Sequence, residues 1–333
     1  MMAVRSMSRS VESFVGTGGW AYFDVPGRDA LTAYARIFPF VEVNATFYEH
    51  PDPRTVAAWR RRVPPSFRFA VRAHRDVTHR LRLRATPGAR TSFARTAAIA
   101  ARLDAVAIVL ETPETVRPIP TDLQDLLSTA KLPCPVALEA RAFRGRPVPA
   151  RLAAVMEAND VADVTDFSRQ APRTESSIAY GRMFGLGERN RWEFTDEELA
   201  SVRSNAEKGD RARVVYAFHG VRMYKDAGRF LTYVRTGAFP RATLQVGLAS
   251  LESILAADAA FPATRTELLR DHGFRVVDMR TDRRIHAHEL LDRLPAGRFG
   301  SARAVVSALA AKPALGAIVG DVSPGPRIGG LSR

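Results

Sequence analysis

The sequence has one cysteine, Cys134, and four lysines among its 49 basic residues, and it has no apolar run near the ~20 residues of a transmembrane helix. A lone cysteine cannot pair within the chain, so small disulfide-stapled scaffolds are excluded. The N-terminal segment MMAVRSMSRS also lacks the apolar core of a secretory signal peptide. These absences predict a cytoplasmic protein with no membrane partner.

Common nucleotide and metal signatures are missing as well. No Gly-x-Gly-x-x-Gly turn follows the first apolar strand and no P-loop occurs, which argues against a dinucleotide-binding fold and against P-loop NTPases. His286 and His288 lie two apart, but no cysteine or carboxylate at ligand spacing completes a metal site. We therefore expect no metal, and the residues identify no other cofactor.

The chain does have a large excess of positive charge. Its 333 residues include 49 Lys and Arg against 35 Asp and Glu, a formal net charge of +14. Guanidinium groups bind phosphate oxygens through paired hydrogen bonds, so the excess favours partners such as nucleic acid or a phosphate-bearing small molecule. A GC-rich coding bias, which favours arginine over lysine in any protein, is an equally good explanation.

Short runs of Val, Ile and Phe alternate with amphipathic stretches between residues 14 and 237, a pattern typical of repeated βα units. Helix start signals separate the runs, including S/T-x-x-E/Q capping boxes at Thr121 and Thr195. Eight strands, each followed by a helix, favour a closed (β/α)₈ barrel of TIM type. The predicted strands are 14–17, 40–46, 67–74, 105–110, 136–141, 161–165, 178–184 and 214–219.

The domain organisation follows from where this pattern stops. We expect a flexible N-terminus at 1–12 and the barrel at 13–240. A small C-terminal α/β extension is predicted at 241–312, with helices at 264–270 and 287–294 and a strand at 274–279. The tail at 313–333 is rich in Gly and Pro and is expected to be flexible.

Polar residues occur at every second position near the ends of several predicted strands. Alternate side chains of a barrel strand point to the axis, and the last ones at the carboxyl end line the active site. If these residues share one rim, the mouth can bind an anion and move protons; alternatively, they form a buried ion-pair network that closes the barrel. The set comprises Glu42, Asn44, Thr46, Arg72, His74, Glu139, Arg141, Tyr180, Arg182 and His219.

Two aromatic residues and a further histidine extend the ligand-binding candidates. Trp20 follows the glycine-rich turn at residues 16–19, and Tyr48 follows the second strand. Each could stack on a base or a sugar, or could pack in the core. His79 could contact a phosphate, although an exposed loop histidine is the simpler explanation.

Seven motifs, in order, resemble those of the domain of unknown function 72 family. They are GTGGW from Gly16, VEVNATFY from Val41, FRFAVRA from Phe67, Thr78-His79, EAR from Glu139, YGRMFG from Tyr180 and YAFHG from Tyr216. The resemblance implies a TIM-like barrel with a site at its rim, and it implies no particular reaction. The chain departs from the family pattern at Glu111, where glutamine is usual, at Ala142 and Phe184, where histidines are usual, and at His219, where asparagine is common.

The first functional hypothesis is an enzyme acting on a phosphate-bearing ligand or nucleic acid. In it, Glu42 or Glu139 is the general base, and His74 or His219 relays protons. Negative charge on the ligand is held by Arg72, Arg141 and Arg182.

Two alternatives remain open. One is a non-catalytic nucleic-acid-binding barrel, in which the arginine-rich segment 72–90 follows the phosphate backbone and Trp20 or Tyr48 stacks on bases. The other is a sugar-phosphate isomerase or lyase. The sequence does not indicate an oligomeric state.

Overall fold

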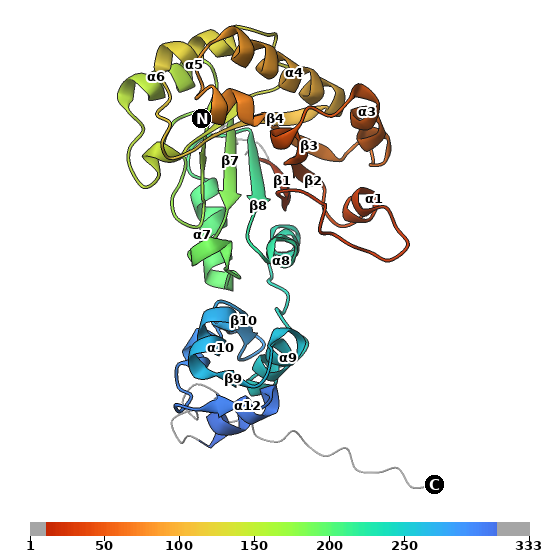
Figure 1. Cartoon of the computed structure of the whole chain (residues 1–333), viewed down its shortest axis with the longest axis vertical. Coiled ribbons are helices and arrows are strands. Elements are labelled where there is room, and N and C mark those ends of the chain that lie inside the picture. The colour runs from red at the N-terminus through yellow and green to blue at the C-terminus, as the bar shows by residue number, and fades with distance from the viewer. Residues whose placement is uncertain (1–10, 312–333) are drawn as a thin grey trace, which may run out of the picture. The chain divides into compact units, whose positions relative to one another are not determined.

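A computed structural model describes residues 11–311 of the chain, which divides into two compact units, Met1–Phe239 and Pro240–Arg333 (Figure 1). The predicted tail at 313–333 and most of the N-terminus predicted to be flexible lie outside the described residues. The first strand begins at Glu12, so regular structure starts within that N-terminal segment.

In the first unit, eight parallel strands pair in chain order into a closed barrel, because β1 pairs with both β2 and β8. The predicted (β/α)₈ barrel is therefore confirmed. The strands are β1 (Glu12–Thr17), β2 (Phe40–Val43), β3 (Arg68–Arg72), β4 (Ala105–Thr112), β5 (Val136–Ala140), β6 (Ala162–Thr165), β7 (Ile178–Met183) and β8 (Arg213–Phe218).

Helices follow seven of the eight strands and surround the barrel (Figure 1). The prediction of a helix after every strand is wrong at β6, because residues 166–177 lead to β7 without one. They are α1 (Ala30–Tyr34), α2 (Ala45–Tyr48), α3 (Pro53–Arg61), α4 (Pro87–Leu103), α5 (Pro120–Leu127), α6 (Ala150–Ala158), α7 (Asp196–Ala206) and α8 (Met223–Thr236). Short helical turns follow three of the strands: η1 (Asp76–Arg80) after β3, η2 (Arg141–Phe143) after β5 and η3 (Glu188–Asn190) after β7.

The helix starts show which capping signals the backbone uses. Thr195 forms the predicted capping box with Glu198 at the start of α7. The box predicted at Thr121 is wrong, because α5 begins at Pro120, two residues before the start that this box implies, and has Ile119 as its N-cap. Proline suits the first helical position, since its fixed φ matches the helix and its missing N–H needs no partner there.

Along the strands, the inward-facing residues change from apolar to charged toward the carboxyl end. Phe40 precedes Glu42 on β2, and Ala137 precedes Glu139 on β5. The same change occurs from Ala70 to Arg72, from Val109 to Glu111 and from Tyr180 to Arg182. The barrel interior therefore consists of an apolar core and, at the carboxyl ends of the strands, a layer of charged side chains.

Five predicted strands end one to three residues earlier than expected; among them, β7 and β8 stop just before Phe184 and His219. β2 stops at Val43, because Asn44 adopts helical backbone angles and opens α2. The hydroxyl of Thr46 donates hydrogen bonds to the carbonyls of Val43 and Arg72, which anchors this helical turn. Likewise His74 lies beyond the end of β3, and Arg141 belongs to η2 rather than to β5.

The second unit has a hydrophobic core of its own. Its elements are α9 (Leu248–Asp258), β9 (Ala263–Thr264), α10 (Arg265–His272), β10 (Val276–Asp278), β11 (Arg284–His286), α11 (His288–Leu291), β12 (Arg298–Phe299) and α12 (Ala302–Ala310). The predicted helices correspond to α10 and a shorter α11, and the predicted strand to β10; α9 and α12 were not predicted. His286 ends β11 and His288 begins α11, so the two imidazoles do not share a strand face.

Within residues 11–311, no group of three or more His, Cys, Asp and Glu side chains could hold a metal ion. The described helices include none that is both long enough and apolar enough to span a bilayer.

Candidate functional site at the barrel mouth

A buried arginine lies at the centre of the charged layer. The Nη2 atom of Arg182 is 3.1 Å from Oε1 of Glu42, and its Nη1 atom is 2.5 Å from Oε2 of Glu111 and also pairs with Glu139. Arg182 is 2% exposed and Glu42 is completely buried. Three carboxylates from β2, β4 and β5 therefore share one guanidinium from β7.

Two further arginines belong to this network. Arg72 Nη2 lies 2.7 Å from Oε2 of Glu111, and Arg141 Nη1 lies 2.8 Å from Oε1 of the same residue. Arg141 Nε also donates to Glu139 at 2.8 Å. Three buried carboxylates thus face these three guanidiniums, with the half-exposed Arg144 as a fourth partner of Glu139, and this charge balance allows such groups to stay ionised away from water.

Glu111 is the member of this network that sequence analysis missed. It continues the alternation of Ala107 and Val109 on β4 and lies opposite Glu139 in the strand register. The predicted strand stopped at Leu110, one residue short of it. Extending the period-two pattern by one residue would have placed Glu111 at the rim.

The arginines keep the carboxylates ionised. Burial alone would raise the pKa of Glu139, but Arg182 and Arg141 lower it to about 2. Burial likewise opposes ionisation of Glu42, and Arg182 holds its pKa well below the usual range. A carboxylate with so low a pKa is a poor proton acceptor near neutral pH. The geometry therefore favours an electrostatic role for both residues over the general-base role considered from sequence.

His219, the residue directly after β8, is joined to the same network. Its Nε2 atom accepts a hydrogen bond from Nε of Arg182 at 3.2 Å. Burial and the positive charge of Arg182 lower the pKa of His219, although Glu42 opposes the shift. The ring is therefore neutral near pH 7. Nε2 also lies 3.5 Å from Oε2 of Glu42, a longer contact than the one with Arg182. Because an arginine Nε can only donate, the shorter contact favours the tautomer with its proton on Nδ1.

Two neighbours fix the position of this imidazole. The ring of Phe184 stacks on it, with centroids 5.1 Å apart and an interplanar angle of 30°. On the GTGGW turn, a Cβ atom at Gly18 would lie 2.2 Å from Cε1 and Nδ1 of His219. The turn therefore needs glycine at this position so that the imidazole can occupy its place.

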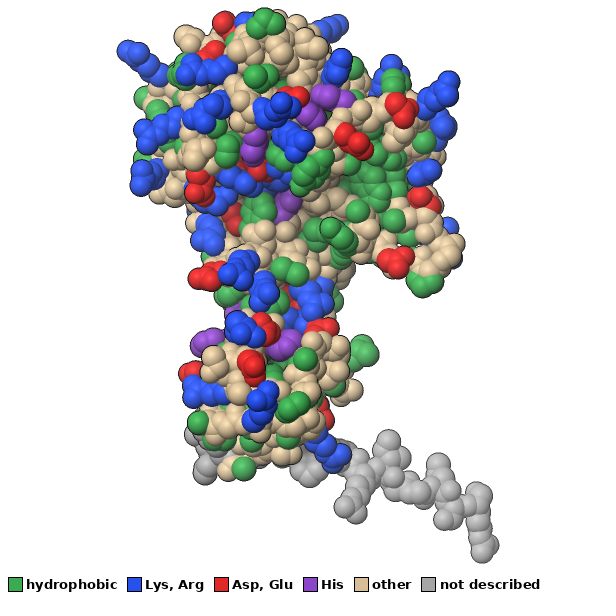
Figure 2. All heavy atoms as spheres, in the orientation of Figure 1, with side chains coloured by type: hydrophobic (Ala, Val, Ile, Leu, Met, Phe, Trp, Pro, Cys, Tyr) green, Lys and Arg blue, Asp and Glu red, His purple; other side chains and the backbone are tan. Residues whose placement is uncertain are grey.

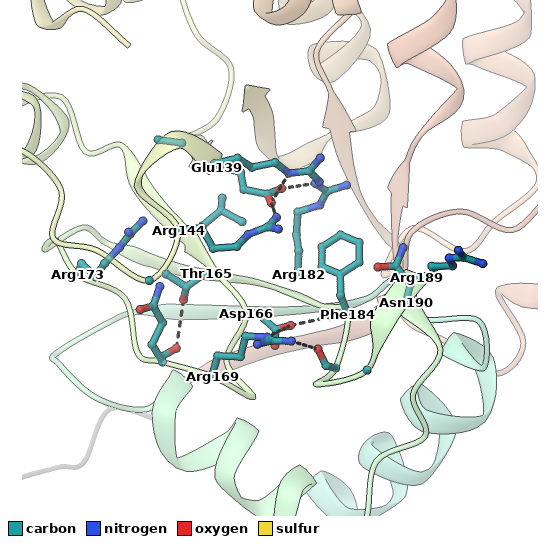
Figure 3. Close-up of a pocket in the computed structure, with 17 residues that line it drawn as sticks. Glu139, Arg144, Thr165, Asp166, Arg169, Arg173, Arg182, Phe184, Arg189 and Asn190 are labelled. Atoms are coloured by element: carbon teal, nitrogen blue, oxygen red, sulfur yellow. Dashed lines mark hydrogen bonds and ion pairs between the residues drawn. The ribbon is translucent and has the colours of Figure 1, made fainter. Parts of the chain in front are cut away.

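Two cavities open on the charged layer. The first has a volume of about 620 Å³ and is lined by six arginines and two carboxylates, Glu139 and Asp166 (Figure 3). The arginines are Arg141, Arg144, Arg169, Arg173, Arg182 and Arg189. The second has a volume of about 700 Å³ and is lined by Asn44, Tyr48, Arg72, Arg141, Arg182 and His219 among the predicted residues.

The six arginines differ in how fully their own chain satisfies them. Arg173 is held by Asp163 and by the carbonyls of Phe143 and Arg146. By contrast, Arg144 is half exposed; its Nη2 donates to Glu139 at 3.2 Å, and its Nη1 lies 3.6 Å from Glu114. The side chain of Arg189 has no hydrogen bond or ion pair with any described residue. Figure 3 shows Arg144 and Arg189 on opposite sides of Phe184.

Several predicted site residues line neither cavity. Trp20 packs edge-on against Trp59, with ring centroids 5.5 Å apart. The buried hydroxyl of Thr46 is used by backbone carbonyls, as described above. These two residues therefore stabilise the loops that carry the rim.

The histidines near β3 are also engaged by their own chain. Nε2 of His74 donates to the carbonyl of Tyr48, and its Nδ1 accepts from the amide of Asp76, so backbone atoms occupy both ring nitrogens. His79 lies in η1 rather than in an open loop. Its Nδ1 contacts the Thr78 hydroxyl at 2.9 Å, and its ring packs against Phe47. The structure therefore leaves His219 as the predicted histidine that lines a cavity.

One known protein family matches the part of the chain that forms the barrel and its mouth. The sequence profile described as "Protein of unknown function DUF72" matches residues 14–239. The chain belongs to this family. The matched residues cover the barrel and its charged layer.

Relatives of the DUF72 chain include the "UPF0759 protein YunF" of Bacillus subtilis, which is 34% identical over 71 residues. That match spans 20% of this chain and 25% of YunF. Among solved structures, DUF72 family proteins of Enterococcus faecalis V583 and Thermotoga maritima MSB8 each align with a TM-score of 0.54. They are 16% and 18% identical, and cover 68% and 67% of this chain and 98% and 99% of their own. At these identities the likeness supports the barrel fold.

Proposed function

We propose that this DUF72 protein is an enzyme that binds a phosphate-bearing small molecule at the barrel mouth and acts on it there. The observation that carries the proposal is the first cavity, in which six arginines outnumber two carboxylates and Arg144 and Arg189 retain donors for a ligand. A phosphate monoester offers several acceptor oxygens, and arginine binds it through two parallel hydrogen bonds. The rim of a (β/α)₈ barrel is also where active sites of this fold occur.

The contacts of the arginine-rich segment 72–90 favour a small ligand over an extended nucleic acid. Arg80 and Arg84 pair with Asp76 and Asp122. Arg82 donates to the carbonyl of Thr115, and Arg90 donates to the carbonyls of Ala85 and Asp125. These arginines fasten their own loops. Figure 2 shows Lys and Arg side chains spread over the visible face of the barrel unit and not gathered into one stripe.

The polar groups at the mouth would act mainly through fixed charges. The carboxylates hold Arg182 and Arg141 in position, and these arginines are ready to stabilise negative charge that develops on the ligand. The neutral imidazole of His219 carries a proton on Nδ1 that can be donated to a ligand oxygen. A preorganised site of this kind suits a reaction at or beside a phosphate.

Calorimetric titration with ribose 5-phosphate tests the binding step, and phosphate release or rearrangement of the sugar, followed by NMR, tests turnover. Replacing Arg144 and Arg189 together by serine removes two charge-assisted contacts, which should weaken binding by about tenfold or more. Arg203→Ser, which removes an exposed arginine paired with Glu207 on α7, is the matched control and should bind as the unaltered protein does. Absence of binding, or equal loss in the control, would refute the proposal.

A further inference from the structure

The second cavity has an aromatic rim that phosphate binding does not explain. Tyr22 and Tyr48 line it with 85% and 63% of their surfaces exposed, and Val221, also at this cavity, is 60% exposed. Across residues 11–311 these two tyrosines are the only aromatic side chains that are largely exposed. Large exposed apolar side chains gathered at one cavity mark a binding surface, since leaving them in water is costly.

The same cavity has a histidine donor next to the tyrosines. Nδ2 of Asn44, which also lines the cavity, donates to the carbonyl of Gly18 at 2.7 Å, which fixes the orientation of the amide. Its Oδ1 atom has no hydrogen-bond donor within the described part of the chain, but that atom is buried and not open to the cavity. Nδ1 of His219 pairs with no described acceptor. A ligand in this cavity would thus meet one free donor, the Nδ1 of His219.

The aromatic cavity and the arginine cavity adjoin each other. Arg141, Arg182, Phe184, Arg189 and Asn190 line both. A phosphate bound by Arg189 therefore lies at the junction, and the rest of the same ligand can extend toward Tyr48. The volume of about 700 Å³ is within the range of small-molecule sites.

We infer that the ligand is a nucleoside monophosphate, with its phosphate on Arg144 and Arg189 and its base stacked at the Tyr22 and Tyr48 rim. This inference rests on the proposed function and narrows its substrate class. A planar base covers exposed tyrosine rings, and one of its ring nitrogen atoms can accept a hydrogen bond from His219. A sugar phosphate alone would leave both rings in water. The nucleotide could be free or could be the 5′ end of a strand, which presents the same chemistry.

Calorimetric titration at fixed ionic strength tests nucleotide recognition separately from phosphate binding. The ligands are AMP, ribose 5-phosphate, adenosine and inorganic phosphate. Base stacking should make AMP bind about tenfold or more tightly than ribose 5-phosphate. Replacing Tyr22 and Tyr48 together by alanine should remove this advantage and leave ribose 5-phosphate binding unchanged. Ile37→Ala, an exposed apolar residue that lines neither cavity, is the matched control and should change neither affinity.

The outcomes are distinguishable. If AMP and ribose 5-phosphate bind equally, or if the tyrosine variant keeps the preference for AMP, the nucleotide inference is overturned while the phosphate proposal stands. If none of the phosphate compounds binds, the proposed function itself fails. A 5′-phosphorylated trinucleotide that binds at least as tightly as AMP, and that needs the two tyrosines, supports the same recognition with a strand end as the source.

Discussion

Nε of Arg182 donates a hydrogen bond to Nε2 of His219 at 3.2 Å, which joins the buried ion network to an imidazole on the cavity wall. Arginine is protonated at every accessible pH, so this contact favours one protonation state of the histidine over the other. A proton on Nε2 would face the Arg182 donor at 3.2 Å, with the nearest acceptor, Oε2 of Glu42, farther away at 3.5 Å. Protonation of both ring nitrogens would also add positive charge beside the guanidinium. The contact therefore keeps His219 neutral, with Nδ1 as its donor.

The first prediction concerns this imidazole. Because burial and Arg182 lower its pKa, His219 should titrate below the usual value of 6.5 and should show the Nδ1-protonated tautomer at pH 7. Long-range nitrogen–proton NMR spectra over a pH series, with the signal assigned through His219→Gln, measure both properties. An imidazolium form at pH 7, or a neutral ring protonated on Nε2, would contradict the assignment.

The same shift makes folding depend on pH. The unfolded chain takes up a proton near pH 6.5, whereas the folded protein resists protonation of His219. Stability from this residue is therefore complete above pH 6.5 and decreases as the pH falls below it. Urea unfolding between pH 8 and pH 5 should show a smaller decrease in the His219→Gln variant than in the unaltered protein.

Replacing Arg182 should reverse the direction in which the stability of the protein changes when the pH is lowered. Arg182→Met leaves Glu42, Glu111 and Glu139 close together in a buried layer without their shared cation, which should cost about 3–5 kcal/mol at pH 7. Without Arg182 the carboxylates would be protonated more readily when folded, so the variant should gain stability as the pH is lowered from 7 to 5. Urea unfolding at both pH values measures the change.

The control for this variant is Arg203→Met. Arg203, on α7, pairs with Glu207 at the C-cap of that helix, and its guanidinium lies 5.5 Å from the centroid of the Tyr233 ring. Surface pairs of this spacing contribute about 0.5 kcal/mol or less. If Arg182→Met is no less stable than this control, the central network does not hold the barrel together in the way its geometry indicates.

The inward-facing charges could be predicted from sequence because they obey a simple period. Glu42, Arg72, Glu139 and Arg182 each follow an inward apolar residue by two positions, so their convergence needed only the barrel and its register. The alternation of inward-facing and outward-facing side chains applies only within a strand. For that reason Asn44 and Arg141 reach the mouth from helical turns, and Thr46 and His74 satisfy neighbouring backbone atoms.

Loop residues carried no such signal. Arg144 and Arg189, which have donors left for a ligand, follow β5 and β7 in segments without alternation. Whether an arginine keeps donors for a ligand depends on which side chains and carbonyls contact it in the folded chain. The sequence pattern does not show these contacts. Trp20 is partly buried because it packs on Trp59, which is distant in sequence, whereas Tyr22 two residues later is exposed.

Two threonines provide a paired test of the helix starts. Thr195→Ala removes a side chain that accepts from the amide of Glu198, and it should destabilise the protein by about 1 kcal/mol. Thr121→Ala alters an exposed residue within the first turn of α5, where Ile119 is the N-cap, and it should change stability by less than about 0.5 kcal/mol. Equal losses in urea unfolding would mean that Thr121 also caps its helix.

Gly18→Ala should disturb the site through a single methyl group. The added Cβ would lie 2.2 Å from His219, so either the imidazole or the GTGGW turn must move. Such overpacking costs about 1–3 kcal/mol, and it should also displace the Nδ1 donor from the cavity. Gly228→Ala is the matched control, because a Cβ there meets nothing within 4 Å inside helix α8, where alanine is preferred to glycine and should raise stability by about 0.5–1 kcal/mol. Urea unfolding of both variants, together with the His219 NMR signals, measures the effects; unchanged His219 shifts in Gly18→Ala would show that the turn moves and the imidazole stays.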